Sequence, residues 1–150
     1  MGEAEGLSAR CRQWLTWVLL ACVVQPGYGG SVAAPQSDAQ DRLAKLMNLY
    51  RAYVEKNQKG PPSEEALREF GQKLPANERA DRRIGDDLEN IFVSPRDKQK
   101  FMVKYSIKPE PSVNRALAWE ATGEKGMHWV ALTIGYVVEY DETTLKQYTK

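Results

Sequence analysis

The sequence predicts an α+β fold, in which a long helix and a short second helix pack on a small antiparallel sheet of three to four strands, with a short C-terminal helix. Three observations lead to this class. Apolar residues follow helical spacing between residues 38 and 74, short apolar or alternating runs follow between 91 and 140, and turn residues separate those runs. Helices and strands that occupy separate stretches of the chain are typical of α+β domains.

The first helix is predicted over residues 38–58. Its apolar residues recur at steps of three or four or lie next to each other, which traces one stripe along a helix; they are Leu43, Leu46, Met47, Tyr50, Tyr53 and Val54. Ser37 or Asp38 can cap the start, and residues 57–62 end the helix.

A second, shorter helix is predicted to start at the N-cap Ser63 and to end before Pro75. Its stripe continues through Leu67, Phe70 and Leu74. Residues 76–90 are mostly charged, so we expect a surface connection with about one turn of helix, anchored by Ile84 and Leu88.

Strand patterns begin after this connection. Residues 91–95 predict a short edge strand, and the alternation of residues 101–105 predicts a half-buried strand with Phe101, Val103 and Tyr105 inward. Three further runs, 116–120, 127–133 and 136–140, are separated by the glycine-containing turns 122–126 and 134–135 and predict an antiparallel meander. Asp141 can cap the final helix, which contains Leu145 and Tyr148.

The N-terminal segment has the pattern of a signal peptide. Arg10 and Arg12 precede an uncharged run, residues 14–24, which as a helix would rise only about 16 Å, roughly half of a bilayer's hydrocarbon core. Small residues at Ser31 and Ala33 predict cleavage after Ala33. The sequence therefore predicts a signal peptide, 1–33, and a single α+β domain, 34–150, which is exported to the periplasm or the extracellular space.

Two alternatives remain for this segment. Residues 19–22 (LLAC) resemble a bacterial lipobox, and lipidation of Cys22 would make the protein a membrane-anchored lipoprotein whose signal ends before Cys22. The segment could also be a buried core helix, although Pro26 and the glycines after it separate it from the rest. The only two cysteines are Cys11 and Cys22, so after cleavage at Ala33 no disulfide or cysteine-based zinc site could form.

The net charge and the histidine content limit the kinds of partner and metal site that can be expected. The net charge is +1, which gives no electrostatic reason to expect nucleic acid, and a membrane is expected only if Cys22 is lipidated. His128 is the single histidine, so a multi-histidine metal site is excluded. We expect no cofactor, no metal and no catalytic residue, and another envelope protein as the partner.

Three short motifs and the order of the segments carry a family resemblance. The motifs are residues 57–62 (NQKGPP), 91–97 (IFVSPRD) and 116–120 (ALAWE), followed by a terminal hairpin through Gly135. Together they resemble small exported proteins of planctomycete-type bacteria whose domains are similar to the globular part of type II secretion pseudopilins. The resemblance implies an envelope domain, and it carries over no catalytic residue. Nothing in residues 14–24 matches a prepilin processing site, so filament assembly is not implied.

Several side chains are candidates for a ligand or partner surface: Arg96, Lys98, Lys104, Trp119, His128 and Trp129. Trp119 and Trp129 lie on neighbouring predicted strands and could face each other, as a core pair or as a stacking platform. His128 could act as a base, and Ser94 as a nucleophile only together with His128. The acids among residues 81–89 lack EF-hand spacing and alternate with arginines.

The pattern favours a non-enzymatic, pseudopilin-like protein-interaction domain of the cell envelope. The alternative is a small-ligand or glycan-binding module that uses Trp119, Trp129 and the basic strand around Lys104. An enzyme is the third interpretation, because no partnered set of catalytic groups can be assembled from spacing alone.

Overall fold

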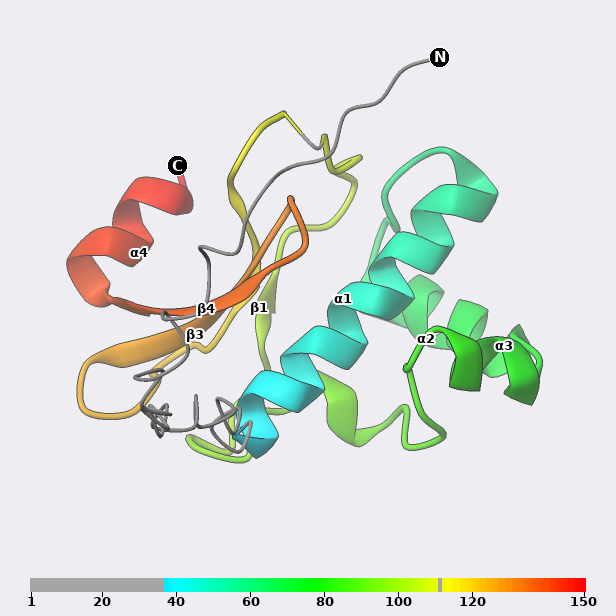
Figure 1. Ribbon diagram of the computed structural model, residues 1–150, viewed down its shortest axis with the longest axis horizontal. Coiled ribbons are helices and arrows are strands. Elements are labelled where there is room, and N and C mark those ends of the chain that lie inside the picture. The colour runs from blue at the N-terminus through cyan, green and yellow to red at the C-terminus, as the bar shows by residue number, and fades with distance from the viewer. Residues whose placement is uncertain (1–36, 111) are drawn as a thin grey trace, which may run out of the picture. The chain divides into compact units, whose positions relative to one another are not determined.

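The computed structural model describes residues 37–110 and 112–150, all of which belong to one compact unit. The predicted signal segment and Cys22 lie outside the described residues. The described part of the chain contains a 20-residue helix, three shorter α-helices and a four-stranded antiparallel sheet. The predicted α+β class is confirmed, including the long first helix and the C-terminal helix (Figure 1).

Helix α1, Asp38–Asn57, is the central element. Ser37 caps its start, because the Ser37 Oγ accepts a hydrogen bond of 3.2 Å from the Gln40 N–H. Gln58 ends it in the left-handed conformation with a φ of 58°. The predicted apolar stripe is confirmed: four members are buried and two are partly buried against the same core, namely Leu43, Leu46, Met47 and Tyr50, and then Tyr53 and Val54.

Helices α2, Glu64–Lys73, and α3, Ala76–Asp81, lie on the side of α1 away from the sheet (Figure 1). Ser63 caps α2 as predicted, since its Oγ accepts from the Ala66 N–H at 3.3 Å. The connection after Pro75 contains a six-residue helix rather than about one turn. Ile84 and Leu88 anchor it, as predicted, because both are buried in the core.

The sheet has the strand order β1-β2-β3-β4, with every pair antiparallel. Its strands are β1 (Met102–Val103), β2 (Ala116–Trp119), β3 (Met127–Leu132) and β4 (Val137–Asp141). The predicted meander is therefore confirmed, although β1 is shorter than the predicted strand. Because the order follows the sequence, β4 forms one edge of the sheet.

Residues 91–95 do not form the predicted edge strand. The 3-10 helix η1, Asn90–Phe92, takes their place, and Ile91 and Phe92 are both buried. Two consecutive buried side chains do not fit the alternation of a half-buried strand. Arg42 on α1 also donates hydrogen bonds of 3.2 Å to the carbonyl groups of Asn90 and Val93, which hold η1 against the helix.

The sheet has α1 on one face and α4, Glu142–Tyr148, on the other (Figure 1). Asp141 caps α4 as predicted, because its Oδ1 accepts from the Thr144 N–H at 2.7 Å. Leu145 packs with Val130 and Leu132 on the α4 face. The larger core lies on the α1 face.

A β-bulge interrupts β2. Ala116 pairs with Leu132 and Ala118 with Ala131, so Leu117 is an additional residue in β2. Leu117 and Ala118 consequently both pack in the core on the α1 face, whereas Ala116 packs on the α4 face.

Candidate functional site

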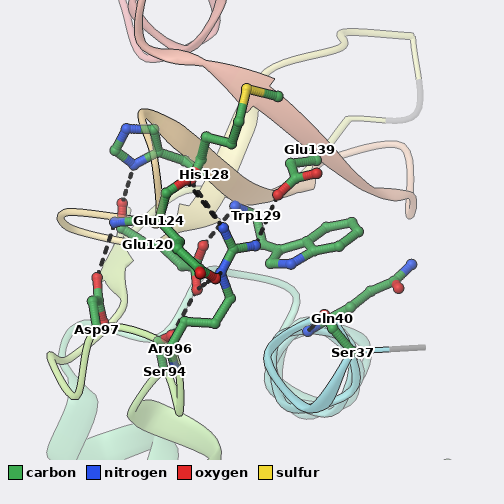
Figure 2. A network of polar contacts seen from close by, with 12 residues as sticks. Ser37, Gln40, Ser94, Arg96, Asp97, Glu120, Glu124, His128, Trp129 and Glu139 are labelled. Carbon is green, nitrogen blue, oxygen red and sulfur yellow. Dashed lines mark hydrogen bonds and ion pairs between the residues drawn. The ribbon is translucent and has the colours of Figure 1, made fainter. Parts of the chain in front are cut away.

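A buried carboxylate organises the main polar network of the sheet, which Figure 2 shows from close by. Glu120 follows β2 and has no exposed surface. Its Oε1 accepts a hydrogen bond of 2.6 Å from the Ser94 hydroxyl, and its Oε2 accepts one of 2.9 Å from the Trp129 N–H. Because both oxygens are hydrogen-bonded internally, this carboxylate connects the loop after η1 to β3.

Arg96 joins the same network from the loop after η1. Its Nη1 lies 2.8 Å from a carboxylate oxygen of Glu139, and its Nε lies 3.3 Å from Glu124 and 3.8 Å from Glu120 (Figure 2). Its Nη2 also donates to the carbonyl of Met127 at 3.3 Å. The side chain is only 16% exposed, so the structure places Arg96 among acids of its own chain rather than on an open basic face.

His128 is buried on the α4 face of the sheet. Its Nδ1 lies 3.0 Å from the carbonyl oxygen of Glu120, and its Nε2 lies 3.0 Å from a carboxylate oxygen of Glu142. A carbonyl oxygen only accepts, so Nδ1 carries a hydrogen. Ser94 instead gives its hydrogen to Glu120, so the described contacts do not assemble a serine–histidine pair.

Trp119 and Trp129 lie on opposite faces of the sheet, and the expectation that they could face each other is wrong. Trp119 pairs with Val130, and its neighbours belong to the α4 face. Trp129 pairs with Glu139 and packs against the core on the α1 face. Residues that alternate along a strand point to opposite faces, so this register cannot form a joint stacking platform.

Lys104 does meet Trp119. Its ammonium lies 6.0 Å from the centre of the Trp119 ring and donates a hydrogen bond of 2.7 Å to the carbonyl of Thr149. Burial, together with the charge of Arg115, lowers the pKa of Lys104 below its usual value.

Lys98 is exposed in a turn with a φ of 59°. The six predicted surface residues therefore do not form one surface.

The described residues were also compared with the requirements of a metal site and of a membrane-spanning helix. Within residues 37–110 and 112–150, no group of three or more histidine, cysteine, aspartate or glutamate side chains is placed to hold a metal ion. In the same part of the chain, no helix is both long and apolar enough to cross a membrane.

A cavity of about 290 Å³ lies where the start of α1 meets the connection before η1. Its charged side chains are largely matched internally. Lys45 forms an ion pair of 2.6 Å with Asp41, and Asp87 accepts a hydrogen bond of 2.6 Å from the Asn90 side chain. Mixed and paired charges give this cavity no clear preference for an anion or a cation.

A second cavity lies between α1 and the start of β4. Its volume is about 310 Å³, and its lining residues come from one face of α1 and from the β3–β4 hairpin: Gln40, Ala44, Met47, Asn48, Gly135, Tyr136 and Val137. Tyr136 is 66% exposed, more than the other exposed large hydrophobic residues of the described chain, Met102 and Ile107. The cavity is therefore open beside the edge strand.

Two further cavities lie near the C-terminal half of α1, and only the first of them is lined by residues of this helix. One, of about 310 Å³, is lined by Arg51, Val54, Glu55, Pro109 and Thr133, and the other, of about 210 Å³, by Ile107, Lys108, Glu110, Val113, Arg115 and Thr133. They share Thr133. The lining positions of α1, from residue 40 to residue 55, recur at three or four residues and thus share a face. We call these three cavities together the α1 groove; the cavity beside β4 shares no lining residue with the other two.

The hairpin fits closely against α1 at Gly135. Its φ of 106° favours glycine, and a Cβ there would lie 2.2 Å from Nη2 of Arg51. Leu132 and Tyr136 close a three-residue loop through a hydrogen bond of 2.8 Å. The Arg51 side chain therefore lies at the junction between the cavity beside β4 and the cavity around Thr133.

The loop between β1 and β2 lines the two cavities that share Thr133. The Tyr50 hydroxyl lies 2.7 Å from the carbonyl of Ile107 and 3.0 Å from that of Lys104, and burial raises the pKa of Tyr50 to about 12. At the other end of the loop, the Thr133 N–H donates to the carbonyl of Arg115 at 2.9 Å. Both ends of this loop are thus fixed to the fold.

β4 presents its outer edge beside the α1 groove. The Leu132–Tyr136 hydrogen bond makes every second residue of β4 from Tyr136 onward face β3, so the backbone groups of Val137 and Glu139 face outward. Among the hydrogen bonds of the described residues, none reaches these outward groups. They can therefore pair with another extended segment.

The α1 groove is not evident from the sequence alone. Its α1 residues adjoin the apolar stripe and include two of its members, Met47 and Val54, beside small or neutral side chains such as Ala44 and Asn48. A search of protein-family models, curated proteins and solved structures finds no match to this chain.

Proposed function

We propose that this protein is an exported, non-enzymatic interaction domain of the cell envelope, which binds an extended segment of a partner protein along β4. The observation that carries the proposal is the outward-facing edge of β4 next to the α1 groove. Addition of a strand to a sheet edge is a common mode of peptide recognition, in which backbone hydrogen bonds supply affinity and neighbouring pockets supply specificity.

The geometry of β4 suits this mode. A segment paired with β4 would form hydrogen bonds with the outward backbone groups of Val137 and Glu139. Its alternate side chains would face α1, because the side chain of Val137 packs on that side of the sheet. The cavity lined by Ala44 and Met47 could then receive one of those side chains.

The non-enzymatic part of the proposal is supported by how the reactive side chains are used. Ser94 donates to Glu120, Glu120 accepts from two groups, and His128 contacts a carbonyl and a carboxylate of its own chain. These contacts stabilise the fold. The alternative glycan-binding function is not supported, because Trp119 and Trp129 are on opposite faces of the sheet and cannot form a joint stacking platform.

The test is a selection from a random library of displayed seven-residue peptides, followed by titration of the selected peptides against purified protein and two variants. Glu139→Pro removes an outward N–H that an added strand needs, and proline is tolerated at such edge positions. Glu139→Ala is the matched control, because it also removes the ion pair to Arg96 but keeps the N–H.

We expect Glu139→Pro to weaken binding about tenfold, the equivalent of one lost hydrogen bond, while Glu139→Ala stays within about threefold of the natural protein. The proposal fails if no peptide is enriched, or if both variants bind equally well. Circular dichroism of both variants would verify that they remain folded.

Export is tested separately by mass spectrometry of the N-terminus of protein isolated from its native cells. A chain that begins at Ala34 supports signal-peptide cleavage, and an acylated Cys22 supports the lipoprotein alternative. An intact N-terminus on folded protein would contradict both.

A further inference from the structure

The side chains along the edge strand β4 are mostly apolar or aromatic. Those of Ile134, Val138 and Tyr140 lie on the α4 face of the sheet, and alternation along the strand places the exposed Tyr136 with them. Between residues 134 and 140 the only charged side chain is that of Glu139. An antiparallel copy of the same strand would therefore meet few charges.

Two-fold symmetry limits how two copies of β4 can pair. Around a two-fold axis, an outward-facing residue of one strand lies opposite an outward-facing residue of the other. The outward residues of β4 are Val137 and Glu139. Three registers pair these residues, with the axis at Val137, at Val138 or at Glu139, and the side chains that each register brings together decide between them.

Two of the three registers place a carboxylate unfavourably. With the axis at Glu139, the Glu139 side chains of the two copies lie opposite each other, and like charges in such positions are destabilising. With the axis at Val138, each Glu139 lies opposite Val137 of the second copy, beside the cavity that Ala44 and Met47 line. A carboxylate there would lose hydration, and the described lining of this cavity contains no cation.

The register with its axis at Val137 has neither problem. It places Val137 against Val137 of the second copy beside the same cavity, and Val138 against Tyr136 of the second copy on the α4 face. Tyr140 then lies opposite Ile134. The two Glu139 residues are four positions apart along the strands, or about 13 Å, a distance at which salt screens their repulsion.

This register also brings opposite charges together, because each Glu139 lies opposite Gly135 of the second copy. The guanidinium of Arg51 occupies the space where a Cβ of residue 135 would lie. Side chains at directly opposite positions have Cβ atoms about 5 Å apart. The Glu139 carboxylate of one copy is therefore within reach of the Arg51 guanidinium of the other.

Both groups have the capacity for this contact. Within residues 37–110 and 112–150, no ion pair involves Arg51. Figure 2 shows Arg96 donating to Glu139, and its hydrogen bond of 2.8 Å goes to Oε1. Among the described residues, no hydrogen bond reaches Oε2 of Glu139, and a carboxylate can accept through both oxygens. A symmetric pair would form the contact twice.

From this match we infer that the partner of β4 is a second copy of the same protein, paired antiparallel about Val137, with Arg51 of each copy bound to Glu139 of the other. The inference rests on the proposed function, because it uses the same strand edge. The paired segment is short, so the dimer is expected to be weak, with a Kd above about 1 µM.

Sedimentation velocity of the purified protein from about 5 to about 500 µM tests the inference, because a weak dimer forms only at high concentration. Arg51→Glu and Glu139→Arg are measured separately and as an equimolar mixture. A dimer of either variant would contain two like-charge contacts, whereas a mixed dimer would contain two attractive ones. The control is Lys73→Glu on α2, where Lys73 contacts only Glu69 at 3.5 Å.

Each charge reversal alone should weaken the dimer at least about tenfold, since attraction becomes repulsion. The mixture should form a dimer within about threefold of the natural affinity, because both contacts are attractive again. Lys73→Glu should also stay within about threefold. Loss of folding cannot produce this pattern, because two unfolded variants would not restore each other.

The inference is wrong if the protein stays monomeric up to about 500 µM, if its dimer tolerates both reversals, or if the mixture does not restore the dimer. When displayed peptides are nevertheless selected and lose affinity with Glu139→Pro, the edge-strand function stands and only the second copy as partner is wrong. If no peptide is selected, or Glu139→Pro leaves peptide binding unchanged, the proposed function itself is wrong, and this inference fails with it.

Discussion

The hydroxyl oxygen of Ser94 lies 2.6 Å from Oε1 of Glu120, and both side chains are completely buried. The contact joins residues 26 positions apart. A buried carboxylate is stable only when its oxygens are hydrogen-bonded, and here one oxygen depends on a serine from the loop after η1. This short hydrogen bond therefore couples the loop to the sheet, together with the contacts that Arg96 makes to β3 and β4.

Replacement of Ser94 by alanine should consequently destabilise the protein. Ser94→Ala removes a donor from a buried acceptor, and we expect the free energy of unfolding to fall by about 1–3 kcal/mol. Urea unfolding monitored by tryptophan fluorescence measures the change. The control is Ser112→Ala at an exposed turn position, which should change it by less than about 0.5 kcal/mol. Equal effects of both substitutions would contradict the role of Ser94.

The stripe on α1 gives a second prediction. Leu46 is 1% exposed in the middle of the core, so Leu46→Ala should leave a partial cavity and cost about 2–5 kcal/mol of unfolding free energy. Lys45 is one position away and forms a partly exposed ion pair with Asp41, so Lys45→Ala should cost less than about 0.5 kcal/mol. Denaturant melts of the two variants test this contrast. Similar small losses would show that the stripe is not a core.

Gly60 gives a third prediction, because backbone atoms of another segment lie against it. A Cβ at this position would lie 2.3 Å from the carbonyl oxygen of Ile107. Gly60→Ala should therefore push away the loop that lines two cavities of the α1 groove, at a cost of about 1–3 kcal/mol. Differential scanning calorimetry should show a clearly lowered Tm. Lys59→Ala, at the exposed neighbouring position, should leave the Tm nearly unchanged.

Asp97 gives a prediction about pH. Burial alone raises the pKa of its carboxyl, but hydrogen bonds from the N–H groups of Gln99, Thr122 and Gly123 outweigh burial and hold the pKa below its usual range. A carboxyl with a lowered pKa in the folded state stabilises the protein above its unfolded pKa of about 3.9 and loses that effect as the pH falls through the lower folded value.

We therefore expect the stability difference between the natural protein and Asp97→Asn to be constant above about pH 5 and to shrink as the pH falls below about 4. Urea melts across this range measure the difference. A difference that stays constant down to about pH 2.5 would show that Asp97 does not contribute through its charge.

The helices and most strands could be predicted because their patterns are local. The stripe from Leu43 to Val54 repeats often enough to identify a helix, and Asp141 followed by Leu145 is enough to identify the start of the last one. Residues 91–95 were different. Their apolar run fits either a strand or a buried turn, and contacts with Arg42, 48 and 51 positions away, decide between them.

The tryptophans show a second limit. Whether Trp119 and Trp129 share a face depends on the register of β2 and β3, and a slip of one residue reverses every side chain. The turn between these strands does not fix that register from sequence alone. The α1 groove could not be predicted for a related reason: a helical pattern shows which face is apolar, but not which flank of that face the sheet leaves uncovered.

The close fit of Arg51 over Gly135 also constrains how this sequence can diverge. A side chain at position 135 would need both a rare backbone conformation and the space that the guanidinium occupies. A related sequence with a larger residue at position 135 would need a shorter side chain in place of Arg51. That change would remove a cation from beside the hairpin. Positions 135 and 51 are therefore expected to change together during evolution, because the residue at one limits the residues that fit at the other.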